Sequence, residues 1–78
     1  IDLIIDIDGK IHPFEIKKTA NPNKDMIKNF NVLENTNLNV GNGGLICFYP
    51  EILPLDEKNK SYPISVIFCK YSAPLYVL

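Results

Sequence analysis

The feature that most constrains the fold is the dipeptide Asp8-Gly9, which stands between two runs of alternating apolar residues. Before it, "IDLIIDI" places every second residue from Ile1 to Ile7 on one side of an extended chain. After it, "KIHPFEIKK" continues as a second extended run. Asp-Gly at such a junction is typical of a two-residue type I′ turn, because both central residues of that turn need positive φ. The sequence therefore predicts a β-hairpin.

A two-residue turn also fixes which residues of the two strands face one another. Ile7 pairs with Lys10, and the pairing continues outward from there one residue at a time. Pro13 then falls opposite Ile4 in a pair that exchanges no ladder hydrogen bonds, so its missing N–H leaves this ladder intact. The turn alone therefore predicts a register that tolerates the proline.

The same register gathers three charged residues on one face of the hairpin. Asp2 falls opposite Glu15, with Cβ atoms about 4.5–5.5 Å apart, and Lys17 follows two residues later. Opposed carboxylates repel each other unless a positive charge lies between them, and Mg²⁺ prefers such hard oxygen ligands. A metal ion with a neighbouring lysine suits metal-assisted phosphodiester hydrolysis. The alternative is a solvated sheet face on which Glu15 and Lys17 form a surface ion pair.

Beyond the hairpin, the pattern changes to helical spacing. Residues 21–37, "NPNKDMIKNFNVLENTN", predict a helix capped by Asn21 or Asn23, with Pro22 in its first turn and Asp25 at the positive end of its dipole. Its apolar residues recur every three or four positions and form one core-facing stripe, made of Met26, Ile27, Phe30 and Leu33.

The rest of the chain predicts further strands. Residues 45–49, "LICFY", form a short apolar run typical of a central strand, joined to the hairpin by a right-handed crossover that makes the pair parallel. Residues 50–63 are expected to form a loop, residues 64–68, "ISVIF", a fourth strand, and residues 74–78, "PLYVL", a fifth. The predicted fold is an α/β chain of α+β type: a mixed sheet with a helix on one face.

Composition limits the possible functions. The 78 residues form one domain at most, and eight lysines against nine carboxylates give a net charge of −1 with no arginine. This excludes the overall basic charge of many nucleic-acid-binding domains, although Lys18, Lys24 and Lys28 are candidates for local contacts or for ordinary solvated surface.

Cys47 and Cys69 lie in apolar runs and are expected to be buried thiols in a reducing cytoplasm. No apolar run is long enough to span a membrane, so no membrane partner is expected.

Asp2, the hairpin and "Glu15-Ile16-Lys17" resemble the PD-(D/E)XK nuclease superfamily, which has the restriction-endonuclease-like fold. More narrowly, the stretch from Ile1 to about Ile67, including "LPLDEKN", resembles the C-terminal domain of unknown function of prokaryotic AAA+-type ATPases. The resemblance implies that Asp2 and Glu15 bind Mg²⁺ or Mn²⁺ and that Lys17 assists catalysis. It also implies a core lacking its N-terminal helix and first strand, so residues 1–78 are expected to be one nuclease-like domain fragment of a larger protein.

Two functions follow from these residues. In the first, the parent protein binds or cuts nucleic acid through Asp2, Glu15 and Lys17, and the isolated fragment is inactive. In the second, the domain is a non-catalytic module that docks on the ATPase domain of the same parent chain, on another protein or on itself. His12 pairs with Ile5 on the opposite face from Asp2 and Glu15, so we expect a structural role for it.

Overall fold

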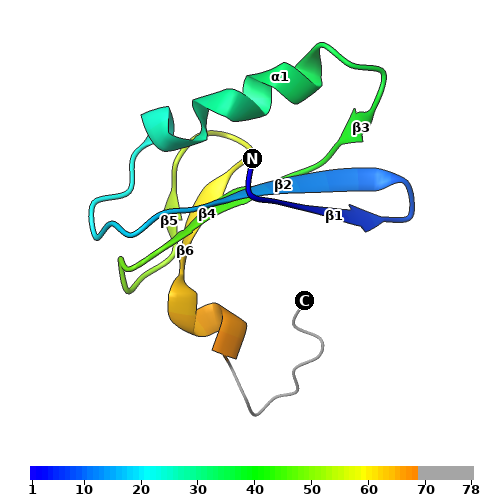
Figure 1. Ribbon diagram of the computed structural model, residues 1–78. Helices are drawn as coiled ribbons and strands as arrows, with labels where there is room; N and C mark the ends of the chain where they lie inside the picture. The colour runs from blue at the N-terminus through cyan, green and yellow to red at the C-terminus, as the bar shows by residue number, and fades with distance from the viewer. Residues whose placement is uncertain (69–78) are drawn as a thin grey trace.

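The predicted hairpin opens the chain in the computed structural model, which describes residues 1–68. Within that range the chain forms a mixed sheet of six strands with a helical layer on one face (Figure 1). This confirms the predicted α+β fold. The elements, in chain order, are β1 Leu3–Ile7, β2 Lys10–Ile16, η1 Lys24–Phe30, α1 Asn31–Glu34, β3 Asn39–Val40, β4 Gly44–Cys47, β5 Leu53–Pro54, β6 Lys60–Pro63 and η2 Ile64–Phe68, where η denotes a 3-10 helix.

The hairpin turn has the backbone conformation that its sequence predicts. Asp8 has φ 54° and Gly9 has φ 86°, the positive values that a type I′ turn requires. The strands pair outward from Ile7 and Lys10, and Pro13 lies opposite Ile4, as expected. The short-range turn chemistry therefore sets the long-range register of β1 on β2.

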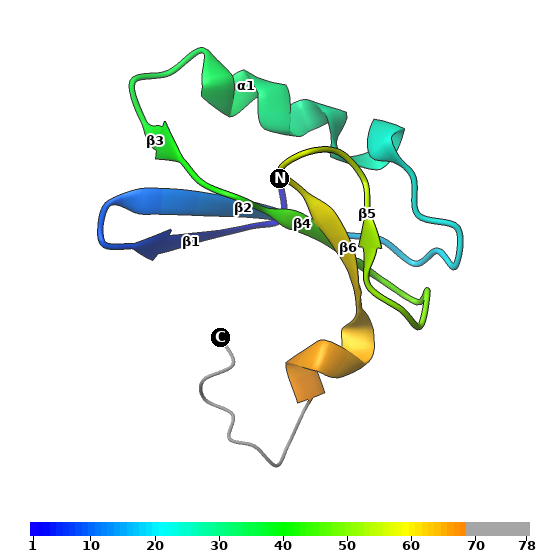
Figure 2. The ribbon, with the colours of Figure 1, turned by 180° about the vertical axis from the view of Figure 1, so that it is seen from behind.

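The strands follow the order β1-β2-β4-β6-β5, with β3 added beside β2. The three inner strands β2, β4 and β6 run parallel to one another, while the outer strands β1 and β5 run antiparallel to their neighbours. The predicted parallel crossover from the hairpin to residues 45–49 is confirmed. Figure 2 shows the arrangement from behind, with η1 and α1 on one side of the sheet and η2 on the other.

The prediction of one continuous helix over residues 21–37 is wrong. η1 begins only at Lys24, where the side-chain oxygen of Asn23 accepts the N–H of Asp25 at 3.0 Å, so Pro22 precedes the helix. Ile27 interrupts η1 with φ −113° and ψ 18°, and α1 contributes only four residues. The many asparagines explain this, because asparagine side chains compete for backbone hydrogen bonds and favour caps and turns over helix interiors.

The core lies between this helical layer and the sheet. The predicted apolar stripe is confirmed, since its residues are buried or half-buried, and all of them except Leu33 pack in the cluster that contains β4 residues. Cys47 is a buried free thiol, as predicted, and Cys69 lies outside the described residues. The strand expected over residues 45–49 spans Gly44–Cys47 in the structure, and Phe48, which follows it, is exposed. The core cluster comprises Ile27, Phe30, Leu45 and Cys47, with Met26, Tyr49 and Leu55 packed against it.

The C-terminal part corrects two predictions. Residues 50–63 contain strands β5 and β6 rather than only a loop, and "ISVIF" forms the 3-10 helix η2 rather than a strand. The polar strand β6 is stabilised by its pairing with β4, a non-local contact that the sequence of β6 does not predict. The strand predicted over residues 74–78 lies outside the described residues. None of the helices described is both long and apolar enough to cross a membrane.

Candidate functional site

Asp2 lies directly before the first residue of β1, and its side chain extends the hydrogen bonding of the hairpin. Its N–H donates to the carbonyl oxygen of Phe14 at 3.0 Å, although Leu3 is the residue opposite Phe14. The chain therefore leaves the predicted register at this point. The carboxylate Oδ2 of Asp2 accepts the N–H of Ile16 at 2.8 Å. This side chain therefore provides an acceptor for a backbone N–H of β2 that has no partner residue in β1.

This hydrogen bond also governs the charge of Asp2. The hydrogen bond from the Ile16 N–H lowers the pKa of Asp2 below its ordinary value of 3.8, and it outweighs the opposing effect of partial desolvation. The positive charge of Lys17 lowers the pKa further. Asp2 is therefore ionised at neutral pH, and its carboxyl group lies against that of Glu15.

Glu15 is buried under the helical layer. It pairs with Leu45 of the core strand β4, and its side chain is only 6% exposed. Charged residues are seldom buried unless they are paired, because desolvation disfavours the ionised form. The fold thus places the buried side chain of Glu15 beside the carboxylate of Asp2.

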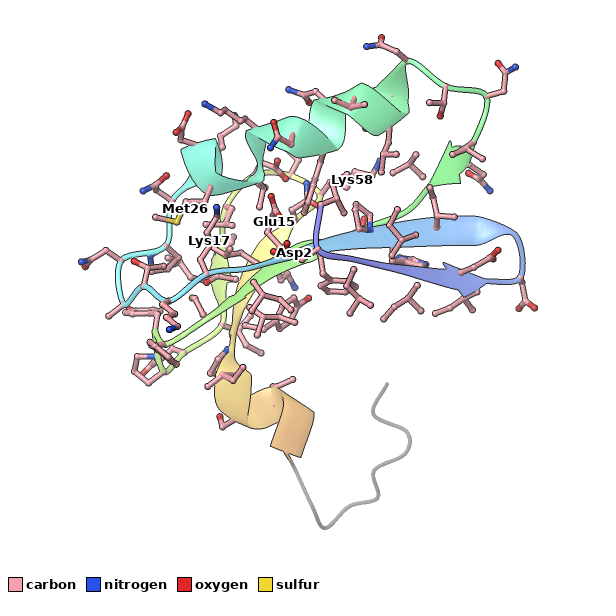
Figure 3. All side chains as sticks on the ribbon, in the orientation of Figure 1. Asp2, Glu15, Lys17, Met26 and Lys58 are labelled. Carbon is pink, nitrogen blue, oxygen red and sulfur yellow. The ribbon has the colours of Figure 1, made fainter. Side chains whose placement is uncertain are left out.

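Lys17 completes the predicted trio at the end of β2. Its N–H donates to the carbonyl oxygen of Ile46 at 2.9 Å, which continues the β2–β4 ladder and keeps the strand alternation. The side chain is exposed, and no ion pair found within residues 1–68 involves it. Figure 3 shows Asp2 and Lys17 on either side of Glu15, near the end of β2. The structure therefore brings the three predicted residues into one neighbourhood.

The three lysines considered for nucleic-acid contacts are all exposed. Lys18 follows β2, whereas Lys24 and Lys28 lie on η1 and line a groove of about 320 Å³ together with Asp25 and Asp56. The groove thus carries both signs of charge and is not lined by Asp2 or Glu15. The structure does not join these lysines into one basic surface with the carboxylate pair.

His12 has a structural environment, as its register predicts. It pairs with Ile5, and its ring Nδ1 lies 2.6 Å from the carbonyl oxygen of Asn42, a hydrogen bond that ties β2 to the loop before β4. Among residues 1–68, no group of three or more His, Cys, Asp or Glu side chains is arranged to hold a metal ion. The described ligand set is therefore limited to two carboxyl groups.

A polar network that sequence reasoning missed lies in the loop between β5 and β6. Asp56 Oδ1 accepts the backbone N–H groups of Lys58 at 2.8 Å and Asn59 at 2.7 Å. The side-chain amide of Asn59 donates to both carboxylate oxygens of Asp56 at 3.2 Å, and its Oδ1 accepts the buried N–H of Gly43 at 2.8 Å. Desolvation by burial acts to raise the pKa of Asp56. The hydrogen bonds from Lys58 and Asn59 outweigh this effect and lower the pKa below its ordinary value. The network closes the loop and ties it to the start of β4.

A protein family described as a domain of unknown function (DUF4143) matches residues 1–67. The chain belongs to this family. The DUF4143 match covers the hairpin, the helical layer, the three inner strands and most of η2. It therefore includes both the Asp2–Glu15–Lys17 neighbourhood and the Asp56–Asn59 network. No curated protein and no solved structure matches the chain.

The DUF4143 match accounts for the resemblance that ran from Ile1 to about Ile67. The loop segment "LPLDEKN", a prominent part of that resemblance, has a structural role in this fold. Its acidic residue and its asparagine hydrogen-bond each other and the backbone. A local signal existed, because an aspartate followed two and three residues later by free N–H groups is typical of an Asx turn.

Proposed function

We propose that this DUF4143 domain carries part of a metal-dependent phosphodiester-hydrolysing site of the PD-(D/E)XK type, which serves to bind or cut nucleic acid in the parent protein. One observation carries the proposal: the carboxyl groups of Asp2 and Glu15 lie against each other at the end of the hairpin, with Lys17 nearby. A like-charge pair on neighbouring strands destabilises a sheet unless a cation offsets it. The resemblance of these residues to the superfamily motif supports the same assignment.

The donor set fits Mg²⁺ or Mn²⁺. These ions take oxygen ligands, need only one or two protein carboxylates and fill the remaining positions with water and substrate oxygens. Asp2 uses Oδ2 for the Ile16 N–H and keeps Oδ1 available, while Glu15 contributes its carboxyl group from under the helical layer. When bound, the ion supplies polarisation of a phosphate oxygen.

The residues of this chain position the metal ligands and the phosphate. The Ile16 N–H fixes the carboxylate of Asp2, and the helical layer holds Glu15 away from bulk water. The exposed ammonium group of Lys17 offers an attractive charge to a phosphate on the solvent side of this pair. The fragment supplies two ligands and one cation, so we expect it to bind metal without measurable cleavage.

Calorimetric titration with Mn²⁺ tests the proposal. The chain should bind one ion, and Glu15→Gln should abolish the heat of binding because it removes a charged ligand at unchanged side-chain size. Glu51→Gln is the matched control, since Glu51 is an exposed glutamate in the loop before β5. In an unfolding experiment, Mn²⁺ at about a hundredfold above its dissociation constant should stabilise the chain by about 2.7 kcal/mol.

The proposal fails if the unmodified chain shows no binding, or if Glu15→Gln binds Mn²⁺ as tightly as Glu51→Gln does. The second candidate function is a non-catalytic docking module, which predicts no metal binding and a higher melting temperature for Glu15→Gln. It is favoured by the sheet face opposite η1 and α1, where Leu3, Ile7 and Ile16 are 42%, 50% and 47% exposed. An ATPase domain of the same parent chain is the partner that the family resemblance implies for this role.

A further inference from the structure

The loop before β4 contains the only Asn-Gly peptide of the sequence, between Asn42 and Gly43. In such a peptide the main-chain nitrogen of the glycine attacks the side-chain carbonyl carbon of the asparagine, because glycine has no side chain to hinder the approach. A cyclic imide forms, the bond to the side-chain amide nitrogen breaks, and ammonia leaves with the proton of the glycine nitrogen. Water then opens the imide to aspartate or isoaspartate. Asn42 is exposed, so water reaches its side chain.

The fold holds both polar groups of this peptide. Its carbonyl oxygen accepts a hydrogen bond from Nδ1 of His12 in β2 at 2.6 Å. Its N–H, which belongs to Gly43, donates to Oδ1 of Asn59 at 2.8 Å in a buried hydrogen bond. Gly43 is itself buried, and a Cβ there would meet the carbonyl oxygen of Pro13. The peptide is therefore fixed between β2 and the loop that precedes β6.

These contacts oppose the first step of imide formation. The Gly43 nitrogen must lose its proton and turn toward the side chain of Asn42. A buried N–H that donates to an amide oxygen is shielded from base, and a peptide hydrogen-bonded at both ends cannot turn. We propose that Asn42 is a deamidation site that the hydrogen bonds from His12 and to Asn59 keep unreactive in the closed fold. Reaction then requires the loop to open, a local event that does not need global unfolding.

Deamidation at this position would damage the centre of the sheet. Isoaspartate adds one methylene group to the main chain directly before Gly43. The next residue, Gly44, begins β4 and pairs with both Phe14 of β2 and Lys60 of β6. The added atom therefore shifts the start of the middle strand against both of its neighbours. A chain that has opened and reacted closes less stably than before.

Mass-spectrometric peptide mapping of the full 78-residue chain after incubation at mildly alkaline pH measures the reaction at Asn42. Deamidation in the folded chain should be at least about tenfold slower than in the same chain unfolded in urea. Asn59→Ala removes the acceptor of the Gly43 N–H and should speed deamidation of the folded chain at least about fivefold.

Leu33→Ala is the matched control, because it destabilises the chain by a comparable amount at a buried position of α1 and leaves both hydrogen bonds of the peptide in place. It should deamidate more slowly than Asn59→Ala. Matching circular dichroism spectra of the two variants exclude misfolding as the cause of a difference.

The urea dependence of the rate in the unmodified chain provides a test that needs no variant. Local opening of the loop exposes little surface, so the rate at Asn42 should hardly change at low urea concentrations. A rate that rises from the start as steeply as global unfolding does overturns the proposal. Deamidation that is equally fast in the folded and unfolded chain, or absent from Asn42 in the unfolded chain, overturns it as well. So does an Asn59→Ala variant that reacts no faster than the unmodified chain or than Leu33→Ala.

Discussion

Removing the side chain of Asn59 tests whether the Asp56–Asn59 network holds the loop before β6 onto the sheet. Asn59→Ala deletes the acceptor of the Gly43 N–H, a buried hydrogen bond of 2.8 Å. It also deletes the amide group that donates to both carboxylate oxygens of Asp56. The backbone N–H of residue 59 still reaches Asp56, so the substitution removes the tie to β4 and leaves the local turn in place.

The expected loss follows from the burial of these groups. A buried donor left without an acceptor costs about 1–3 kcal/mol, and a further hydrogen bond lost to a partly exposed carboxylate adds about 1 kcal/mol. The free energy of unfolding should therefore fall by about 2–4 kcal/mol. For a chain of 78 residues the whole free energy of unfolding is about 4–12 kcal/mol, so this is a large fraction of the total.

Urea unfolding followed by circular dichroism measures this loss. Asn37→Ala is the matched control, because Asn37 is an exposed asparagine in the bend after α1 and its loss should change the free energy of unfolding by less than about 0.5 kcal/mol. A loss below about 0.5 kcal/mol for Asn59→Ala, at an unchanged dependence on urea, refutes the reasoning. It would mean that solvent satisfies the Gly43 N–H as well as Asn59 does.

Two further outcomes follow from the same region. The lowered pKa of Asp56 means that its charge stabilises the fold above pH 3.8 and that this contribution disappears as the pH falls through the lower folded-state pKa. The stability advantage of the unmodified chain over Asp56→Asn should therefore shrink between neutral pH and about pH 2, and an advantage that does not vary with pH contradicts this. Gly43→Ala should cost about 1–3 kcal/mol, because the added Cβ meets the carbonyl oxygen of Pro13. Urea unfolding measures this cost, and a loss below about 0.5 kcal/mol for Gly43→Ala refutes the steric argument.

Local chemistry explains which parts of the fold were predictable from the sequence. The turn at Asp8 and Gly9 depends only on the φ values that those residues adopt, and it sets the register of the whole hairpin. The apolar stripe of the helical layer was predictable for the same reason, since spacing alone defines it. The kink at Ile27 was not, because it reflects competition between weak helix propensity and packing on the sheet.

The strand β6 shows why the remaining errors occurred. "KSYP" has no apolar alternation, yet it pairs in parallel with β4 and buries Ser61. The following "ISVIF" has the β-branched composition of a strand and forms η2 instead. In β6, the pairing with the distant strand β4 overrides the local preference. At the candidate site, the sequence predicted that Asp2 and Glu15 meet, but it did not show that one oxygen of Asp2 is already bound to Ile16.

Because Cys47 is buried, the rate at which its thiol is alkylated measures local unfolding of the chain. Its thiol lies in the core between the helical layer and β4, where no reagent reaches it in the closed state. Thiols react only when they are exposed as thiolates, so alkylation of Cys47 requires the helical layer to separate from the sheet. In a chain with Cys69 replaced by serine, the alkylation rate therefore measures how often that separation occurs, without any added probe.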